Sequence, residues 1–296
     1  MVAFHIHVEP SAGPAPVAKV VASAKDRVEM NAYMLTSRAV LRSITRDCRR
    51  GVKVEVILET RPYGGKRIVR RERRALSSTC ATVHAPPGRF LGRYVYSHAK
   101  YVVTDPKHGG RASISTGNFT WTSFHKDRDY VLTTRDGSVV HSLDTVFRAD
   151  WNHKRAGDGP RHHLVLSPGA EPALAHVISQ PGPVWIEAEE LGDAPRILKA
   201  IAAKGGDAHL VLPASEMKHA SGRIAKLEKA GVDVRLAHKP YMHAKAIVGP
   251  RLTYMGSVNF SRSSLYHNRE VGVLLPTPKI MLRRVREDWT SAKPAE

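Results

Sequence analysis

The sequence predicts an α/β fold made of two similar halves. A segment that begins at Ser97 recurs almost unchanged from Met242, and apolar strand patterns alternate with helix patterns along the whole chain. This alternation is typical of sheets covered by helices on both faces. We expect the halves to span residues 1–155 and 161–296, with a linker at 152–161 that is rich in glycine and charge.

The first half is predicted to alternate between strands and helices. Residues 4–8 alternate with period two, as in a strand, and the apolar positions after Pro16 have helical spacing. Ser37 is expected to cap the next helix, and Gly51 stands just past the end of that helix. The predicted strands lie near residues 4–8, 27–33, 53–58 and 80–84, and the predicted helices near 16–22, 38–48 and 67–77.

The second half repeats this order, and the two halves also end alike, at Asp150-Trp151 and Asp288-Trp289. Its predicted strands lie near residues 164–168, 184–188, 209–212 and 232–236, and its helices near 197–203 and 224–230. A duplicated chain usually folds as a pseudo-two-fold pair. We therefore expect the two repeated segments to meet at the pseudo-axis and form one composite active site within a monomer.

Charge and cysteine content narrow the class of protein. The 46 Lys and Arg residues against 27 Asp and Glu give a formal charge of +19, which favours a polyanionic partner such as nucleic acid or an anionic membrane surface.

With only Cys48 and Cys80, a disulfide framework or a cysteine-rich metal site is not expected, and both are predicted to be buried, reduced thiols. The sequence has no apolar run long enough for a membrane span, so a soluble protein is expected, either cytoplasmic or exported after removal of a leader.

The repeated segments carry the residues with chemistry. His98 and Lys100 are two residues apart, as are His243 and Lys245, and this spacing points both side chains to one face of a strand. A second cluster follows each pair, with Thr116 and Asn118 in the first half. The corresponding residues of the second half are Ser257 and Asn259. A third cluster contains Asp129 in the first half and Glu270 in the second.

This layout resembles the phospholipase D superfamily, whose signature is HxK, four residues, Asp, then Gly/Ser-x-Asn-Phe and an acidic residue. Pro250 stands where the second signature Asp is expected, and Ser115-Thr116-Gly117 matches the Gly-Ser-x pattern only loosely. The compact length is most like the small bacterial nucleases of the superfamily. In those, one site is built from two copies of a chain with a single motif.

The resemblance implies hydrolysis of a phosphodiester without metal or cofactor. One neutral histidine attacks phosphorus and the other, protonated, donates to the leaving oxygen. By resemblance His98 is the nucleophile and His243 the acid, and Asp129 and Glu270 hold the second ring nitrogens. The groups expected around the phosphate are Lys100, Lys245, Asn118 and Asn259, with Thr116 and Ser257 as further donors. His5 and His7 share a strand face, but we interpret them as ordinary histidines because no Cys or acidic partner has zinc-like spacing.

A basic run favours nucleic acid as the substrate, with a single strand preferred. Tyr94 and Tyr96 lie beside Arg93 and are expected to stack on bases, whereas Tyr101 is expected in the core. The residues predicted to bind nucleic acid are Lys66, Arg67, Arg70, Arg71, Arg74 and Arg93. Two alternatives stay open: a phospholipase D or phosphatidyl transferase acting on phospholipids without stable membrane insertion, and a non-catalytic nucleic-acid binder. The choice between DNA and RNA also stays open.

Overall fold

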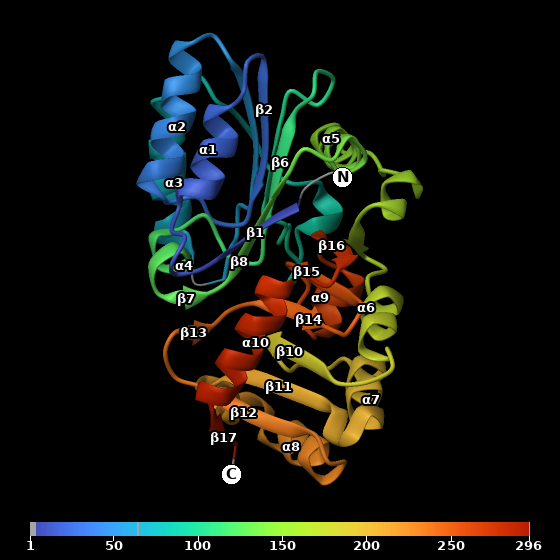
Figure 1. The fold of residues 1–296 in the computed structure, drawn as a ribbon. Coiled ribbons are helices and arrows are strands. Elements are labelled where there is room, and N and C mark those ends of the chain that lie inside the picture. Colours follow the sequence, from blue (N-terminus) through green and yellow to red (C-terminus); the bar gives the residue numbers. More distant parts are fainter. Residues whose placement is uncertain (1–3, 64, 296) are drawn as a thin grey trace.

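The computed structural model describes residues 4–63 and 65–295, and its first half is built on a seven-stranded mixed sheet (Figure 1). The strands β2, β3 and β4 are parallel, and β5, β6, β8 and β1 continue the sheet antiparallel from the other side of β2. In spatial order they are β1 (Phe4–Val8), β8 (Tyr130–Thr134), β6 (Arg111–Ser115), β5 (Tyr101–Thr104), β2 (Arg27–Ala32), β3 (Lys53–Leu58) and β4 (Thr82–His84).

Helices cover both faces of this sheet. The buried apolar side chains of α1 and α2 pack on one face, and α5 packs on the other through Val139, Leu143 and Phe147. The helices of this half are α1 (Ala15–Ala22), α2 (Arg38–Arg49), α3 (Lys66–Ser77), α4 (Trp121–His125) and α5 (Gly137–Trp151), with a 3-10 turn at Gly88–Phe90.

The second half repeats this arrangement. Its eight-stranded sheet has the same order of equivalent strands, and one short strand, β17, is added at its edge. From that edge the strands are β17 (Lys293–Pro294), β12 (Asp233–Ala237), β11 (Ala208–Pro213), β10 (Val184–Ala188), β14 (Lys245–Val248), β15 (Leu252–Gly256), β16 (Glu270–Pro276) and β9 (Val165–Ser167). The helices are α6 (Glu171–Ile178), α7 (Pro195–Lys204), α8 (Met217–Lys229), α9 (Arg262–Tyr266) and α10 (Lys279–Ser291), with 3-10 turns at Gly159–His162, Gly205–Asp207 and Ala214–Glu216.

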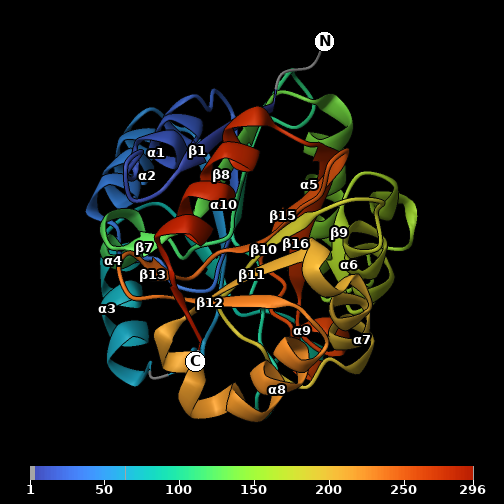
Figure 2. The same ribbon diagram turned by 60° about the horizontal axis from the view of Figure 1, so that its bottom comes forward.

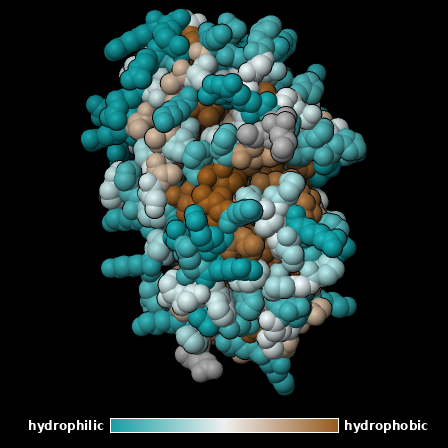
Figure 3. All heavy atoms as spheres, in the orientation of Figure 1, coloured by the Kyte–Doolittle hydropathy of each residue, from teal (hydrophilic) through white to brown (hydrophobic). Residues whose placement is uncertain are grey.

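The two α/β halves pack as a pseudo-two-fold pair. Figure 2 shows them from a second direction, with α5 and α10 on the inner side of their sheets. These two helices and the facing strands of both sheets share one apolar core, while each half has an outer core of its own. On the face drawn in Figure 3, apolar side chains gather where the halves meet and hydrophilic side chains cover most of the remaining surface. The predicted fold class is therefore confirmed.

Backbone and ion pairs cross between the halves in a symmetric way. The short strands β7 (Asp127–Arg128) and β13 (Tyr241–Met242) pair with each other although they belong to different halves. Arg128 pairs with Asp288 of α10 at 2.6 Å, and Arg269 pairs with Asp150 of α5 at 2.7 Å. All four side chains are buried. The Asp-Trp sequence that ends each half thus supplies the partner for an arginine of the opposite half.

Two local predictions need correction. Cys48 and Cys80 form a disulfide, with Cα atoms 5.4 Å apart, so the prediction of reduced, buried thiols is wrong. The reason is that the end of α2 packs beside the connection from α3 to β4, which brings together two residues 32 positions apart. Ser37 does precede α2, but its side chain makes no capping hydrogen bond.

Among the described residues, no helix is both long and apolar enough to cross a membrane.

Candidate active site

The repeated histidines are brought together by crossed backbone hydrogen bonds. The amide of His98 donates to the carbonyl of Arg269 at 2.8 Å, and the amide of His243 donates to the carbonyl of Arg128 at 3.2 Å. Each histidine segment therefore pairs with the segment of the other half that carries the acidic residue. Both histidines line one cleft of about 640 Å³ between the halves.

Each histidine is held by a carboxylate of the opposite half. His98 Nδ1 lies 3.0 Å from Glu270 Oε2, and His243 Nδ1 lies 3.0 Å from Asp129 Oδ1. Burial lowers the pKa of His98, and the attraction of Glu270 opposes this shift. Burial alone would raise the pKa of Glu270, but the nearby His98 and Lys100 hold that pKa below its usual value. These contacts fix the ring orientation and direct Nε2 of each imidazole away from its supporting carboxylate.

Both lysines are almost fully buried beside their histidines. Lys100 Nζ donates to the carbonyl of His98 at 2.5 Å, and Lys245 Nζ donates to the carbonyl of His243 at 2.6 Å. Burial lowers the pKa of Lys100 well below its usual value, with Glu270 opposing the shift. The Lys100 ammonium also lies 5.1 Å from the centre of the Tyr33 ring.

The two asparagines line the cleft at equivalent positions. The backbone amide of Asn118 donates to Ser123 Oγ at 3.2 Å, and that of Asn259 donates to Ser264 Oγ at 2.9 Å. Ser264 Oγ in turn donates to Glu270 at 2.6 Å, so this serine links the asparagine loop to the carboxylate that holds His98. Sequence reasoning missed these serines, although a serine five residues after the asparagine recurs in both halves.

The hydroxyl groups of Thr116 and Ser257 do not face the cleft. Thr116 Oγ1 donates to Asp129 Oδ1 at 2.7 Å and accepts from the amide of Tyr130. Ser257 Oγ bonds both the amide and the carbonyl of Val271. These two hydroxyls are therefore not placed to contact a phosphate, because their hydrogen bonds are made within the protein. Thr116 instead supports the carboxylate that orients His243.

Sequence reasoning also missed Glu189, which follows β10 and lies inside the cleft. Its Oε2 is 2.5 Å from Lys245 Nζ, and its Oε1 is 3.3 Å from His243 Nε2. Burial alone would raise the pKa of Glu189, but the charges of His243 and Lys245 hold that pKa well below its usual range. The position is occupied by Tyr33 in the first half, whose ring lies 4.6 Å from that of His98 in a T-shaped arrangement. The two histidines therefore have unlike surroundings.

The two halves also line the cleft with different residue types, aromatic from the first half and acidic from the second. Tyrosines line it on the side of the first half, and two of them, Tyr63 and Tyr94, are exposed to solvent. The second half contributes Glu189, Glu190 and Asp193. The tyrosines of the cleft are Tyr33, Tyr63, Tyr94 and Tyr96. Tyr101 is fully buried, as expected of a core residue.

The signature Asp of the first half has a structural role, away from the cleft. In the first half, the carboxylate of Asp105 accepts hydrogen bonds from the amides of Lys25, Asp26 and Arg27, where β2 begins. It does not line the cleft. Near Pro250 the bonded amides are different: Gln180 Oε1, in the segment that precedes β10, accepts from the amides of Arg251 and Leu252. The change to Pro250 removes no group from the cleft.

The predicted basic residues lie on α3 and at the rim of the cleft. Arg67, Arg70, Arg71 and Arg74 are exposed, whereas Glu72, the acid between them, is buried and accepts from the amide of Leu35. The outward face of α3 is therefore basic. Arg93 is exposed, and its guanidinium lies 5.4 Å from the ring centre of Tyr94 at the cleft. Lys66 begins α3, and its side chain lies outside the described part of the structure.

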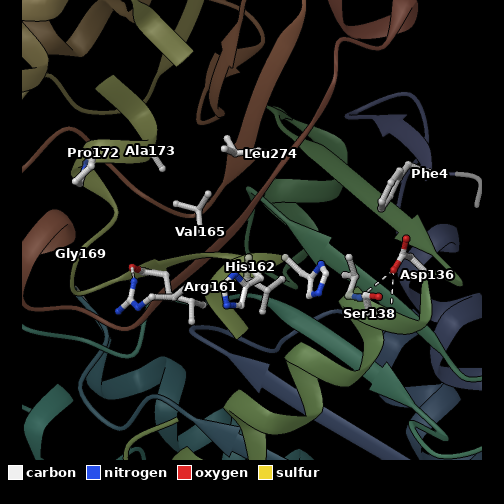
Figure 4. Close-up of a pocket in the computed structure, with 14 residues that line it drawn as sticks. Phe4, Asp136, Ser138, Arg161, His162, Val165, Gly169, Pro172, Ala173 and Leu274 are labelled. Carbon is white, nitrogen blue, oxygen red and sulfur yellow. Dashed lines mark hydrogen bonds between the residues drawn. The ribbon is translucent and has the colours of Figure 1, made fainter. Parts of the chain in front are cut away.

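Other candidate sites are less suited to chemistry. The hollow drawn in Figure 4 has a volume of about 460 Å³ and is lined by Arg161 and His162, but by none of the repeated motif residues. Arg161 donates there to the carbonyls of Leu166 and Pro168 at 2.8 and 2.7 Å, so its guanidinium is already engaged. Across residues 4–63 and 65–295, no group of three or more His, Cys, Asp or Glu side chains is arranged to hold a metal ion.

A match to a family model relates this chain to known proteins. A family model described as "Cardiolipin synthase, PLD-like domain" matches residues 17–151 and 189–288. The chain belongs to the phospholipase D superfamily. Members of this superfamily are phosphodiesterases and transferases, and the two halves found here have its phosphodiester-active fold. Comparison with curated proteins finds none that matches.

Two solved structures have a similar fold over nearly the whole chain, and a third matches about half of it. A phosphatidylserine synthase from Haemophilus influenzae is 11% identical with a TM-score of 0.70, and the match covers 98% of this chain and 87% of that one. A polyphosphate kinase from Porphyromonas gingivalis is 15% identical with a TM-score of 0.69 over 97% of this chain, which spans 50% of the kinase. Nuc from Salmonella typhimurium, a phospholipase D family member, is 16% identical with a TM-score of 0.46, covering 52% of this chain and 97% of Nuc. At these identities the likeness concerns the fold.

Proposed function

We propose that this chain is a phosphodiesterase that hydrolyses nucleic acid through a covalent phosphohistidine. The observation that carries the proposal is the crossed pair in the cleft. His98 and His243 come from different halves, and each is oriented at Nδ1 by a carboxylate of the other half, 3.0 Å away in both cases. A single phosphodiester placed between them would meet one nucleophile and one acid.

In the proposed reaction, Nε2 of neutral His98 attacks phosphorus. The bond from phosphorus to the leaving oxygen breaks, and that oxygen takes the proton from Nε2 of His243. In the second step, His243 takes a proton from water while the water oxygen attacks phosphorus. The bond to His98 then breaks, which releases the phosphorylated product and restores both side chains.

The unlike surroundings of the two histidines support this division of roles. Burial lowers the pKa of His98, which favours the neutral ring that a nucleophile requires. His243 has a carboxylate oxygen at each ring nitrogen, 3.0 Å from Nδ1 and 3.3 Å from Nε2. Only the protonated ring can donate at both nitrogens, so this environment suits a general acid.

The remaining cleft residues would stabilise the charge on the nonbridging oxygens. Lys100 and Lys245 are buried beside the histidines, where the negative charge of a bound phosphate would favour their protonated forms and electrostatic interactions are stronger than in water. Asn118 and Asn259 line the same cleft and would supply amide donors. No metal takes part in this scheme.

Charge and aromatic side chains favour nucleic acid as the substrate. The chain carries a formal charge of +19, and the outward arginines of α3 have no acidic neighbour on their face. The exposed rings of Tyr63 and Tyr94 line the cleft, where bases of a single strand can stack. The second candidate is a phospholipid, because Glu189, Glu190 and Asp193 on the opposite wall would suit a cationic or hydroxylated head group.

A direct comparison of substrates tests the proposal. Labelled single-stranded DNA, RNA and phospholipid vesicles are incubated with the protein in millimolar EDTA, with the His98→Ala variant as the control. We expect cleavage of a nucleic acid that survives EDTA and is lost in the variant. Cleavage of phospholipid alone would favour the second candidate, and nucleic-acid binding without cleavage would favour a non-catalytic binder. Loss of activity in EDTA with rescue by Mg²⁺ would overturn the two-histidine mechanism.

A further inference from the structure

A basic hollow of about 490 Å³ lies on the first half, next to the catalytic cleft but separate from it. It is formed where α2, α3 and α4 meet (Figure 1). The side chains that matter for the argument are Arg38, Arg42, Arg71, Trp121 and His125.

The three arginines of this hollow, Arg38, Arg42 and Arg71, are free to hold an anion. All are exposed, and none has an ion-pair partner among the described residues. No acidic residue is among those that line the hollow. Guanidinium groups that converge without a carboxylate to neutralise them are suited to phosphate, which they bind through paired hydrogen bonds.

Trp121 adds an aromatic surface to the hollow. The residue is 56% exposed, so its ring is accessible to a ligand. Two neighbours lie against this ring: the His125 ring stacks on the indole with centroids 5.0 Å apart and planes 12° apart, and Lys126 Nζ lies 5.3 Å from the ring centre. His125 Nδ1 also hydrogen-bonds the carbonyl of Trp121 at 2.8 Å. An exposed ring held in one orientation is a platform on which a base can stack.

Two hydrogen-bonded segments connect the hollow to the cleft. The amide of Phe119 donates to the carbonyl of Met34, and the amide of Thr36 donates to the carbonyl of Phe119. At one end of these segments, Met34 and Asn118 line the cleft, and at the other end Ser37 and Trp121 line the hollow. Three extended residues span about 10 Å. This corresponds to about three nucleotide steps at ~3.4 Å each, and to fewer in a stretched strand.

We infer that this hollow is a nucleotide subsite for the substrate strand, outside the phosphodiester that is cleaved. A base of the strand stacks on Trp121, and a backbone phosphate is held by Arg38, Arg42 and Arg71. The inference rests on the proposed nucleic-acid function and extends it, because it says where the strand runs after it leaves the cleft. It also predicts that activity depends on strand length.

The test compares a long and a short substrate. The long substrate is a labelled single strand of 12 thymidines, which is about four times as long as the distance between the cleft and the hollow. The short substrate is bis(p-nitrophenyl) phosphate, which reaches only the cleft. For Arg38→Ala/Arg42→Ala we expect KM for the oligonucleotide to rise about tenfold or more. The slope of log affinity against log salt should weaken by about 0.7 for each phosphate that the variant no longer binds. Trp121→Ala should raise this KM by about tenfold. Turnover of the short ester should stay unchanged in both variants.

Arg46→Ala/Arg49→Ala is the matched control. These two arginines are exposed on the same helix and carry the same charge, but they do not line the hollow. An equal rise in KM for both pairs would mean that only net charge matters, and an unchanged KM in Arg38→Ala/Arg42→Ala would mean that the strand does not reach the hollow. Either result overturns the subsite while leaving the nuclease proposal intact. Turnover of the short ester without any cleavage of the oligonucleotide would overturn both.

Discussion

Glu189 Oε2 lies 2.5 Å from Lys245 Nζ, within the cleft that contains both histidines. The other oxygen of this carboxylate is 3.3 Å from His243 Nε2, and Asn259 Nδ2 is 3.5 Å from Oε2. A carboxylate thus contacts three of the groups that the proposed mechanism assigns to the substrate phosphate. We interpret Glu189 as an internal anion that a phosphodiester must displace.

Glu189→Gln is therefore expected to bind phosphate more tightly than the wild type. Glutamine keeps the shape of the side chain and an acceptor for Lys245, but it removes the negative charge that competes with the ligand. We expect the inhibition constant of inorganic phosphate, measured against hydrolysis of bis(p-nitrophenyl) phosphate, to fall by about tenfold, or about 1.4 kcal/mol. Glu190→Gln is the control, since Glu190 lines the same cleft but has no contact with His243 or Lys245 among the described residues. An unchanged or larger inhibition constant would contradict the interpretation.

The crossed ion pairs are expected to hold the halves together. Arg128–Asp288 and Arg269–Asp150 are buried at the interface, and Asp150 also accepts from Arg89. Removing one partner of a buried pair leaves an uncompensated charge, which costs about 3–5 kcal/mol. Asp150→Asn and Asp288→Asn should each lower the free energy of unfolding by this amount in urea denaturation.

Arg283→Gln provides the comparison for this prediction. Arg283 is 3.9 Å from Glu287 on the exposed side of α10, so its replacement should change stability by less than about 1 kcal/mol. Equal effects of the buried and the exposed substitutions would mean that the crossed pairs do not stabilise the interface. Hydrolysis of bis(p-nitrophenyl) phosphate by Asp150→Asn is a second measurement. Asp150 pairs with Arg269, and the next residue, Glu270, holds His98.

Much of the fold could be predicted because the same strand and helix patterns occur in both halves of the sequence. The strand at residues 184–188 was predicted at the bounds that the structure has, and it was recognised by its match to residues 28–32. The helix predicted near residues 224–230 begins earlier, at Met217, because the turn at Ala214–Glu216 leads directly into it. The Cys48–Cys80 disulfide could not be predicted, since the spacing of two cysteines says nothing about which elements pack side by side.

The site could be predicted only where both halves carry the same residue type. The histidines, lysines, asparagines and carboxylates recur, and the structure brings them to one cleft or its immediate support. Glu189 was missed because its counterpart is Tyr33, so comparison of the halves gives no matching pair. That Glu270 serves His98 rather than His243 also follows from the packing of the halves, which no local pattern encodes.

Glu9 gives a prediction about pH and stability. Burial raises the pKa of Glu9 to about 8, while its hydrogen bond from the amide of Gly13 opposes the shift. The folded chain then keeps a proton that the unfolded chain releases above about pH 4.5, the usual value. Between pH 4.5 and 8 the folded state therefore binds more protons, so this group makes stability fall as pH rises. Glu9→Gln should flatten the decline in urea midpoint over this range, and an unaltered decline would show that Glu9 is ionised in the folded state.

The roles of the two histidines can be separated by the leaving group. A general acid matters in proportion to how poorly the leaving group departs, whereas a nucleophile is needed whatever departs. His243→Ala should lose several orders of magnitude on an oligonucleotide but much less on bis(p-nitrophenyl) phosphate, because p-nitrophenolate leaves without a proton.

His98→Ala should be nearly inactive on both substrates, and the wild type quenched during turnover should carry an acid-labile, base-stable phosphoryl group on His98. This outcome agrees with the surroundings of the two rings, since burial lowers the pKa of His98 and Glu189 lies 3.3 Å from Nε2 of His243. The reversed pattern, or an adduct on His243, would mean that the roles are exchanged. Equal inactivity of both variants on both substrates would remove the support for any division of labour, because the acid would then be needed even where nothing has to be protonated.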